Sequence, residues 1–299
     1  MTLILSCATR DFVIQVSDRK LTRLLPNGTV EDVDLESNKA VVVCNTTVFG
    51  YTGLAELEGE NTGTWVANVI SEAKCVGALD SCQAIASKAA AALTAISCSN
   101  EAKRQAFVAV GWQTDRRWTA TTPLVAFASN ALGARGGWLP IAEREFTVRV
   151  HVLRRPRRFV FHDAGCRLSS ALRADIEKTL RVAIKRKAGA GAVATLLASA
   201  IRSVAKTDPQ VGRNLMVVCI PKAAVRQDPN EKFSVDLILQ RPHQAGDLSL
   251  LSRQPRLSTM SFLTAPEGVT DTKDFSPHFV CGGIRTGNYR IVETHTTEG

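Results

Sequence analysis

The sequence predicts an α+β fold in which two stacked sheets lie between two pairs of helices, an αββα sandwich of four layers. Segments of one type follow one another in groups, as strands, two helices, strands, two helices and strands, rather than in alternation. Each helical segment also has an apolar stripe that must be buried against a neighbour. Two sheets stacked face to face, with a helix pair outside each, would bury every such stripe.

Short apolar runs predict four strands at the start of the chain. The first two are separated by Arg10-Asp11, which is typical of a hairpin. The polar stretch that follows contains Pro26-Asn27-Gly28 and predicts a loop with a turn. The strand-like runs cover residues 2–9, 12–18, 39–44 and 47–52.

Helical periodicity predicts two pairs of helices, the first at residues 62–76 and 81–97. In the second pair, the apolar residues of 168–184 recur every four positions, and those of 193–204 follow the i, i+3, i+4, i+7 pattern. Asp208-Pro209 ends the last helix. Further strands are expected at residues 106–112, 124–128, 146–153, 158–161 and 215–220.

The composition changes after Pro221, where Pro, Thr, Ser and Gly become more frequent. Apolar runs shorten there to residues 235–239, 278–281 and 289–292. We therefore expect one domain over residues 2–221 and a loop-rich extension over residues 222–299 that packs on or beside it.

The formal net charge of +9 raises nucleic acid as a partner. The cations are concentrated locally, in the segment 154–158 around Pro156 and in Lys185, Arg186 and Lys187. Neither a recognition module nor a basic strip interleaved with aromatic residues accompanies them. A solvated hairpin turn and a helix C-terminus that favours cations explain them better, so a nucleic-acid partner is not expected.

Eight cysteines are present, but no CxxC pair, and the five histidines are scattered. This pattern favours buried, reduced thiols over disulfides or a metal site, and no cofactor is expected.

No apolar run reaches the roughly 20 residues of a membrane helix. The first seven residues also lack the features of a signal peptide. We expect a soluble, cytoplasmic protein without a membrane partner.

Thr2 is a candidate nucleophile. A threonine hydroxyl does not ionise near neutral pH, but an N-terminal threonine has its own α-amine, with a pKa of about 7.7–8.0, as a base. Thr2 is small enough for ordinary removal of Met1, and it begins a predicted strand that would hold it rigidly. We therefore expect Met1 to be removed and Thr2 to become the first residue.

Three other residues could support this nucleophile. Asp18 ends the second strand, which antiparallel pairing returns to the level of Thr2. Lys39 opens the third strand and could supply a cation that favours the neutral amine and stabilises an alkoxide. Gly53 follows the fourth strand, where a backbone N–H could bind an oxyanion.

The chain opens with TLILSCATRDFVIQVSDRKLT, which resembles the opening of proteasome β subunits, a family of N-terminal nucleophile (Ntn) hydrolases. Its later segment NKAVVVCNTTVFGYTGLAEL is similar to the lysine-strand-strand-glycine segment of that family. Asp18 follows Thr2 by 16 positions, and Gly53 follows Lys39 by 14, as in the family. Because Thr2 directly follows Met1, we expect no propeptide, and the chain looks more like the simplified bacterial proteasome-related proteins than the β subunits that carry a propeptide.

A third segment, VATLLASAIRSVAKTDPQVGRNLMVVCIP, resembles the late helix, turn and strand of the family and puts Asp208 on its second aspartate. Val211 and Cys166 stand where the family has supporting serines. The resemblance covers about residues 2–220.

The resemblance implies a four-layer Ntn-hydrolase fold and a threonine-type peptidase that acts on peptides or unfolded proteins. It also implies a homo-oligomeric ring and leaves open whether an ATPase partner exists. In this mechanism the Thr2 hydroxyl attacks the carbonyl, and the site residues are Thr2, Asp18, Lys39 and Asp208, with the oxyanion hole at Gly53 and a substrate pocket at Tyr51 and Ala55.

Two alternatives stay open. One is an amidase or acylase of the same fold that acts on a small molecule. The other is a non-catalytic ring or scaffold subunit, with nucleic acid at the basic segment 154–158. The altered serine positions and the long extension favour this second alternative.

Overall fold

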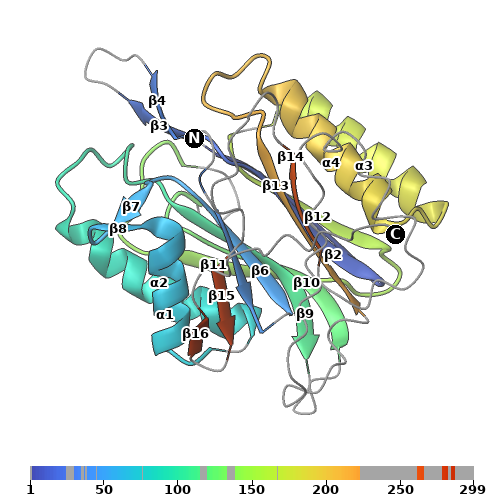
Figure 1. The fold of residues 1–299 in the computed structure, drawn as a ribbon, viewed down its shortest axis with the longest axis horizontal. Coiled ribbons are helices and arrows are strands. Elements are labelled where there is room, and N and C mark those ends of the chain that lie inside the picture. Colours follow the sequence, from blue (N-terminus) through green and yellow to red (C-terminus); the bar gives the residue numbers. More distant parts are fainter. Residues whose placement is uncertain are drawn as a thin grey trace, which may run out of the picture.

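The structure is a computed structural model of the 299-residue chain. It describes residues 2–24, 30–34, 37, 39–44, 46–75, 77–114, 120–132, 139–166, 168–222, 261–265, 278–281 and 284–286. This part of the chain has a mixed α/β fold with two large sheets (Figure 1).

The five-stranded sheet contains the N-terminal hairpin. Its strand order is β12 (Phe159–Gly165), β1 (Leu3–Thr9), β2 (Phe12–Asp18), β13 (Leu215–Pro221) and β14 (Ser261–Ala265). All four neighbouring pairs are antiparallel. Every residue of β1 and β2 is buried, because other strands or helices cover both faces and both edges.

The seven-stranded sheet is formed mainly by the middle of the chain. Its order is β11 (Thr147–Val152), β10 (Ala120–Ser129), β9 (Ala106–Thr114), β6 (Thr47–Thr52), β5 (Ala40–Val43), β15 (His278–Cys281) and β16 (Ile284–Thr286). Only β15 and β5 run parallel to each other. Two small hairpins complete the strands: β3 (Leu21–Leu24) with β4 (Val30–Asp34), and β7 (Glu56–Leu57) with β8 (Glu60–Asn61).

Three groups of buried side chains hold these elements together. The first lies between the seven-stranded sheet and helices α1 (Thr62–Glu72) and α2 (Ala78–Ala95). The second lies between the five-stranded sheet and helices α3 (Ser170–Lys185) and α4 (Ala190–Val204). The third joins the facing sides of the two sheets. Figure 1 shows the two helix pairs on opposite sides of the sheets.

Local sequence signals set several element ends. The side chain of Asn61 accepts a hydrogen bond from the Gly63 N–H and caps α1, and Ser169 caps α3 through the Leu172 N–H. Helix α1 ends at Glu72, four residues before the predicted end, and Lys74 follows in a left-handed conformation with φ of 52°. The strand predicted at residues 47–52 has the same bounds in the structure.

Two sequence-based expectations are wrong. The polar stretch predicted as a loop contains the hairpin of β3 and β4, while Pro26-Asn27-Gly28 lies outside the described residues. The basic segment 154–158 is not a hairpin turn, because β11 and β12, which it joins, belong to different sheets. The segment is a crossover between the sheets.

The extension contributes strands at both sheets, since β14 pairs with β13 and β15 pairs with β5. The apolar runs at 235–239 and 289–292 lie outside the described residues.

The described cysteine side chains are free thiols, and only that of Cys98 is exposed. Among the described helices, none is both long enough and apolar enough to cross a bilayer.

Candidate active site

Thr2 lies at the start of β1, where it is 5% exposed. The register of β1 with β2 pairs Ile4 with Ser17, which brings Asp18 beside Leu3. The Leu3 N–H donates a 2.6 Å hydrogen bond to Oδ2 of Asp18. The antiparallel hairpin therefore returns Asp18 to the level of Thr2, as the strand lengths predict.

Lys39 connects this hairpin to the other sheet, because it directly precedes β5. Its Nζ lies 2.6 Å from Thr2 Oγ1 and 3.2 Å from Oδ1 of Asp18, and it also donates to the carbonyl oxygen of Lys20. The side chains of Lys39 and Asp18 are both fully buried. An ammonium group has three N–H donors, so each donor has one acceptor here.

This arrangement determines what Lys39 can do chemically. Burial lowers the pKa of Lys39, and the Asp18 carboxylate opposes that shift. In its ammonium form, which the three acceptors match, Lys39 has no lone pair to take the Thr2 proton. In that form it can stabilise negative charge on Thr2 Oγ1, while another group acts as the base.

The carbonyl group of Thr2 accepts two hydrogen bonds that the sequence did not predict. The Cys166 N–H donates to it at 2.9 Å and the Thr52 hydroxyl at 3.3 Å. Gly165 has a φ of 92°, and a Cβ there would collide with the Thr2 carbonyl oxygen. Only glycine allows β12 to approach Thr2 so closely. The glycine in the DAGC segment at the end of a strand was the available signal.

Asp208 is connected to Thr2 through Cys166. The Cys166 thiol donates to Oδ2 of Asp208 at 2.9 Å, and the Gln210 N–H donates to Oδ1 at 2.8 Å. Burial raises the pKa of Cys166 to about 12, and the carboxylate of Asp208 adds to this shift, so the thiol keeps its proton and remains a donor. Val211, at the second altered serine position, is buried among apolar residues below α4.

A cavity of about 300 Å³ lies beside Thr52, Gly165 and Cys166, the residues that contact the Thr2 carbonyl group. Gly53 borders it and has a φ of 123°, and a Cβ there would collide with the Gln105 side chain. Gln105 Oε1 accepts the Leu54 N–H at 2.7 Å and so fixes the turn after β6. The cavity is lined by Thr52, Gly53, Arg104, Gln105, Ala106, Ser129, Ala131, Leu139, Pro140, Asp163, Ala164, Gly165 and Cys166.

Tyr51 and Ala55 do not line this cavity, contrary to expectation. Strand side chains alternate between faces, and Tyr51 points with Phe49 into the core beneath α1 and α2, where it is 2% exposed. Ala55 lies beyond the turn, where its carbonyl oxygen accepts the Thr62 N–H at the start of α1. The structure thus brings Asp18 and Lys39 to Thr2 and connects Asp208 to it through Cys166. Gly53 directly follows Thr52, whose hydroxyl donates to the Thr2 carbonyl.

Within the described ranges, no three His, Cys, Asp or Glu side chains come together as a metal ion would require. A comparison with protein-family models and with curated proteins finds no match to this chain. The geometry around Thr2 therefore carries the functional argument.

Proposed function

We propose that this protein is a threonine-type peptidase that uses Thr2 as its nucleophile after the bond between Met1 and Thr2 is cleaved. The observation that carries the proposal is the 2.6 Å hydrogen bond from Lys39 Nζ to Thr2 Oγ1, made by a lysine that is itself buried against Asp18. Burying an ammonium costs free energy even when a carboxylate pairs with it. Buried, perturbed charges are frequent at functional sites, which favours a catalytic role for Lys39 over a structural one.

In the proposed reaction, the Thr2 α-amine takes the hydroxyl proton while Oγ1 attacks the scissile carbonyl. Lys39 stabilises the developing charge on Oγ1, and the Gly53 N–H receives the oxyanion. The protonated amine then gives its proton to the leaving amine as the amide bond breaks, which leaves an ester on Thr2. Water attacks that ester with the amine again as base, the amine returns this proton to Oγ1 as the ester bond breaks, and the carboxylic acid is released with the Thr2 hydroxyl restored.

The same proposal includes the four-layer αββα architecture, with one helix pair outside each sheet. The separate apolar groups beneath α1 and α2, beneath α3 and α4, and between the sheets support this arrangement. A homo-oligomeric ring and a peptide or unfolded-protein substrate follow only from the resemblance to proteasome β subunits, and the cytoplasmic location stays a prediction from the sequence.

A small-molecule amidase is the second candidate. It is supported by the cavity of about 300 Å³ beside Gly53 and Gly165, which is at the lower end of the range for small-ligand pockets. Both candidates use the same nucleophile and differ only in the size of the acyl group that they accept.

Hydrolysis assays test the proposal. Wild-type protein whose N-terminal residue has been confirmed as Thr2 is compared with Thr2→Ala and Thr2→Ser, on fluorogenic peptides and on small amides. We expect Thr2→Ala to lose activity and Thr2→Ser to keep part of it, because serine retains the hydroxyl. Thr94→Ala, at an exposed threonine of α2, is the matched control and should behave as wild type.

The outcomes separate the candidates. Turnover of peptides supports the peptidase, and turnover of small amides alone supports the amidase. Full activity in Thr2→Ala contradicts both. No turnover of any substrate by protein with an exposed Thr2 supports a non-catalytic subunit.

A further inference from the structure

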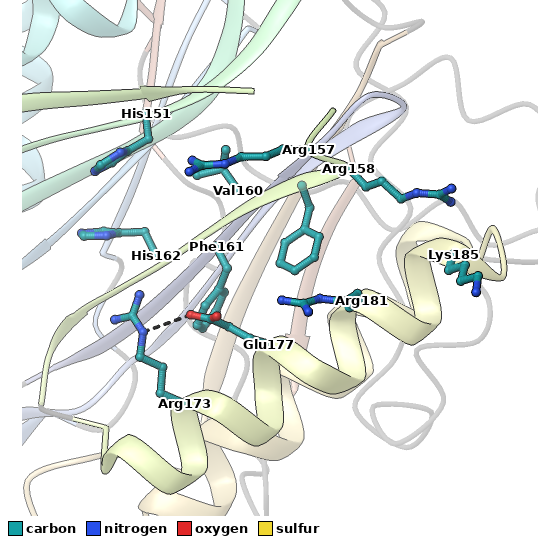
Figure 2. A pocket seen from close by; sticks show the side chains of 11 residues that line it. His151, Arg157, Arg158, Val160, Phe161, His162, Arg173, Glu177, Arg181 and Lys185 are labelled. Atoms are coloured by element: carbon teal, nitrogen blue, oxygen red, sulfur yellow. Dashed lines mark hydrogen bonds and ion pairs between the residues drawn. The ribbon is translucent and has the colours of Figure 1, made fainter. Parts of the chain in front are cut away.

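A second and larger cavity, of about 750 Å³, lies on the far side of β12 from β1, between this strand and α3 (Figure 2). Residues 157–162 all border it, as do four residues of α3 and His151 of β11. Successive side chains of a strand point to opposite faces, so a cavity bordered by six consecutive residues runs along the edge of the strand. We call this cavity the β12 groove.

No described strand other than β1 pairs with β12, so the edge that borders the groove has no partner in this part of the chain. In the described part of the chain, β12 is the last strand of its sheet, and β1 is its one neighbour. An edge strand presents alternating N–H and C=O groups along its free side, which another extended chain can pair with.

The wall opposite this edge is a row of α3 side chains at four-residue spacing: Arg173, Glu177, Arg181 and Lys185. Figure 2 shows that α3 accompanies β12, with Arg173 near His162 at one end and Lys185 on the side of Arg158 at the other. Four helical residues rise about 6 Å. Alternate residues of a strand are about 6.6 Å apart, so the row matches every second side chain of an added strand.

Most of the charged side chains that border the groove are cations. Arg173 is occupied by Asp163 and by Glu177, whose Oε1 lies 3.1 Å from its Nε. The other four cations, Arg157, Arg158, Arg181 and Lys185, are exposed, and the described residues include no ion-pair partner for them. Arg181 and Lys185 come from the helix and the other two from the strand end, so positive charge lies on both sides of the groove.

These features favour a peptide over a nucleic acid. A phosphodiester backbone cannot pair with the alternating donors and acceptors of a strand edge. Phe159 and Phe161 border the groove, but both rings pack against the core beneath α3 and α4, and the Arg173 guanidinium lies 5.8 Å from the centroid of Phe161. Neither ring is an open platform for base stacking. Cations also protect edges from self-pairing, but that role does not explain the matched row on α3.

We propose that the β12 groove binds an extended acidic peptide segment of a partner protein. The segment adds as a strand to the free edge of β12 and places carboxylates at alternate positions against Arg181 and Lys185. This proposal goes beyond the hydrolysis at Thr2 and does not depend on it. The two sites share β12, because Asp163 lines the cavity of about 300 Å³ beside Gly165 and also pairs with Arg173 of the groove.

Fluorescence anisotropy with a labelled ten-residue peptide of alternating Glu and Thr tests the proposal. The full chain is used in the Thr2→Ala background, so that hydrolysis cannot consume the peptide. We expect saturable binding that the double variant Arg181→Glu/Lys185→Glu weakens by about tenfold or more, because two attractive pairs become repulsive. Lys178→Glu is the matched control, since this exposed lysine of α3 lies outside the groove, and it should stay within about twofold of the background.

Two further probes test the binding mode. The same peptide with Gln in place of Glu should lose binding, and so should a peptide that is N-methylated at alternate residues, because methylation removes donors of the added strand. Undiminished binding of the methylated peptide would overturn strand addition. Absence of peptide binding, or tighter binding of a single-stranded oligonucleotide than of the acidic peptide, would overturn the proposal as a whole.

Discussion

Lys39 is the residue on which the proposed chemistry depends. Its buried ammonium is balanced by the Asp18 carboxylate at 3.2 Å, and Asp18 in turn accepts the N–H groups of Leu3 and Lys20. A buried ion pair of this kind contributes little net stability, but the loss of one partner leaves the other charge uncompensated. Stability and activity should therefore respond differently to changes in this pair.

Lys39→Met is expected to lower the free energy of unfolding by about 3 kcal/mol, because Asp18 becomes a buried charge without its cation. Hydrolysis should fall by at least about 100-fold, because Thr2 Oγ1 loses its charged donor. The double variant Asp18→Asn/Lys39→Met should recover much of the stability but none of the activity. Urea unfolding and the hydrolysis assay measure the two effects. Recovery of activity in the double variant would contradict the role of Lys39.

His162 gives a prediction about pH. Burial, followed by the charges of His151 and Arg173, lowers the pKa of His162 to about 3. Its Nε2 is shielded from solvent and has no hydrogen-bond partner in the described residues, and its ring stacks on Phe127 with 4.2 Å between centroids. In the unfolded chain the pKa of His162 is near 6.5. Between about pH 3 and pH 6.5 the unfolded chain therefore binds a proton at His162 more readily than the folded protein does.

The stability contributed by His162 is therefore complete above about pH 6.5 and is lost as the pH falls towards 3. His162→Phe keeps the stacking ring and removes the titration. Urea unfolding at pH 7 and pH 4.5 should show a smaller loss of stability in His162→Phe than in the wild type. Equal losses would show that His162 is not protonated on unfolding.

Single residues of the site were predicted where residue type and spacing along the chain indicate the chemistry. Thr2, Asp18 and Lys39 are such residues, and the structure brings them into contact. The hydroxyl of Thr52 and the N–H of Cys166 were not predicted, because a contact with a backbone carbonyl leaves no pattern along the sequence.

Among the elements, β12 has the most to do with the site, because its C-terminal end holds Thr2. Gly165 has positive φ and lies against the Thr2 carbonyl oxygen. Gly59, in the turn between β7 and β8, also has positive φ, at 78°, but a Cβ there would meet nothing within 4 Å. The two glycines separate the cost of backbone strain from the cost of a collision.

Gly59→Ala is expected to cost about 1 kcal/mol of stability through strain alone, with activity unchanged. Gly165→Ala should cost about 3 kcal/mol or more and abolish hydrolysis, because β12 must move away from Thr2. Thermal unfolding and the hydrolysis assay measure both. Wild-type activity in Gly165→Ala would show that the contact between β12 and Thr2 is not required.

The strands show which elements can be predicted from sequence and which cannot. Apolar runs such as Val48 to Tyr51 predicted buried strands well, because burial on both faces requires continuous apolar sequence. The hairpin of β3 and β4 was missed because its exposed strand carries Glu31, Asp32 and Asp34. The crossover from β11 to β12 was taken for a hairpin because strand pairing depends on contacts that are distant in sequence.

For the whole molecule, the order of grouped elements was sufficient to predict a mixed fold with helices against sheets. It was not sufficient to predict that β14 and β15 of the extension join different sheets, because their short runs have no distinctive pattern. The position of Thr2 is a property of the whole fold. Lys39 and Thr52 reach Thr2 from the seven-stranded sheet side, and Asp18 and Cys166 reach it from the sheet that contains β1.

Intact-mass spectrometry of the protein, with and without a threonine-directed epoxyketone or boronate, tests the central claim most directly. The account predicts a mass that corresponds to a chain beginning at Thr2, and one inhibitor adduct per chain that maps to Thr2 and is absent in Thr2→Ala. A chain that retains Met1, or a chain with a free Thr2 that forms no adduct, would contradict it.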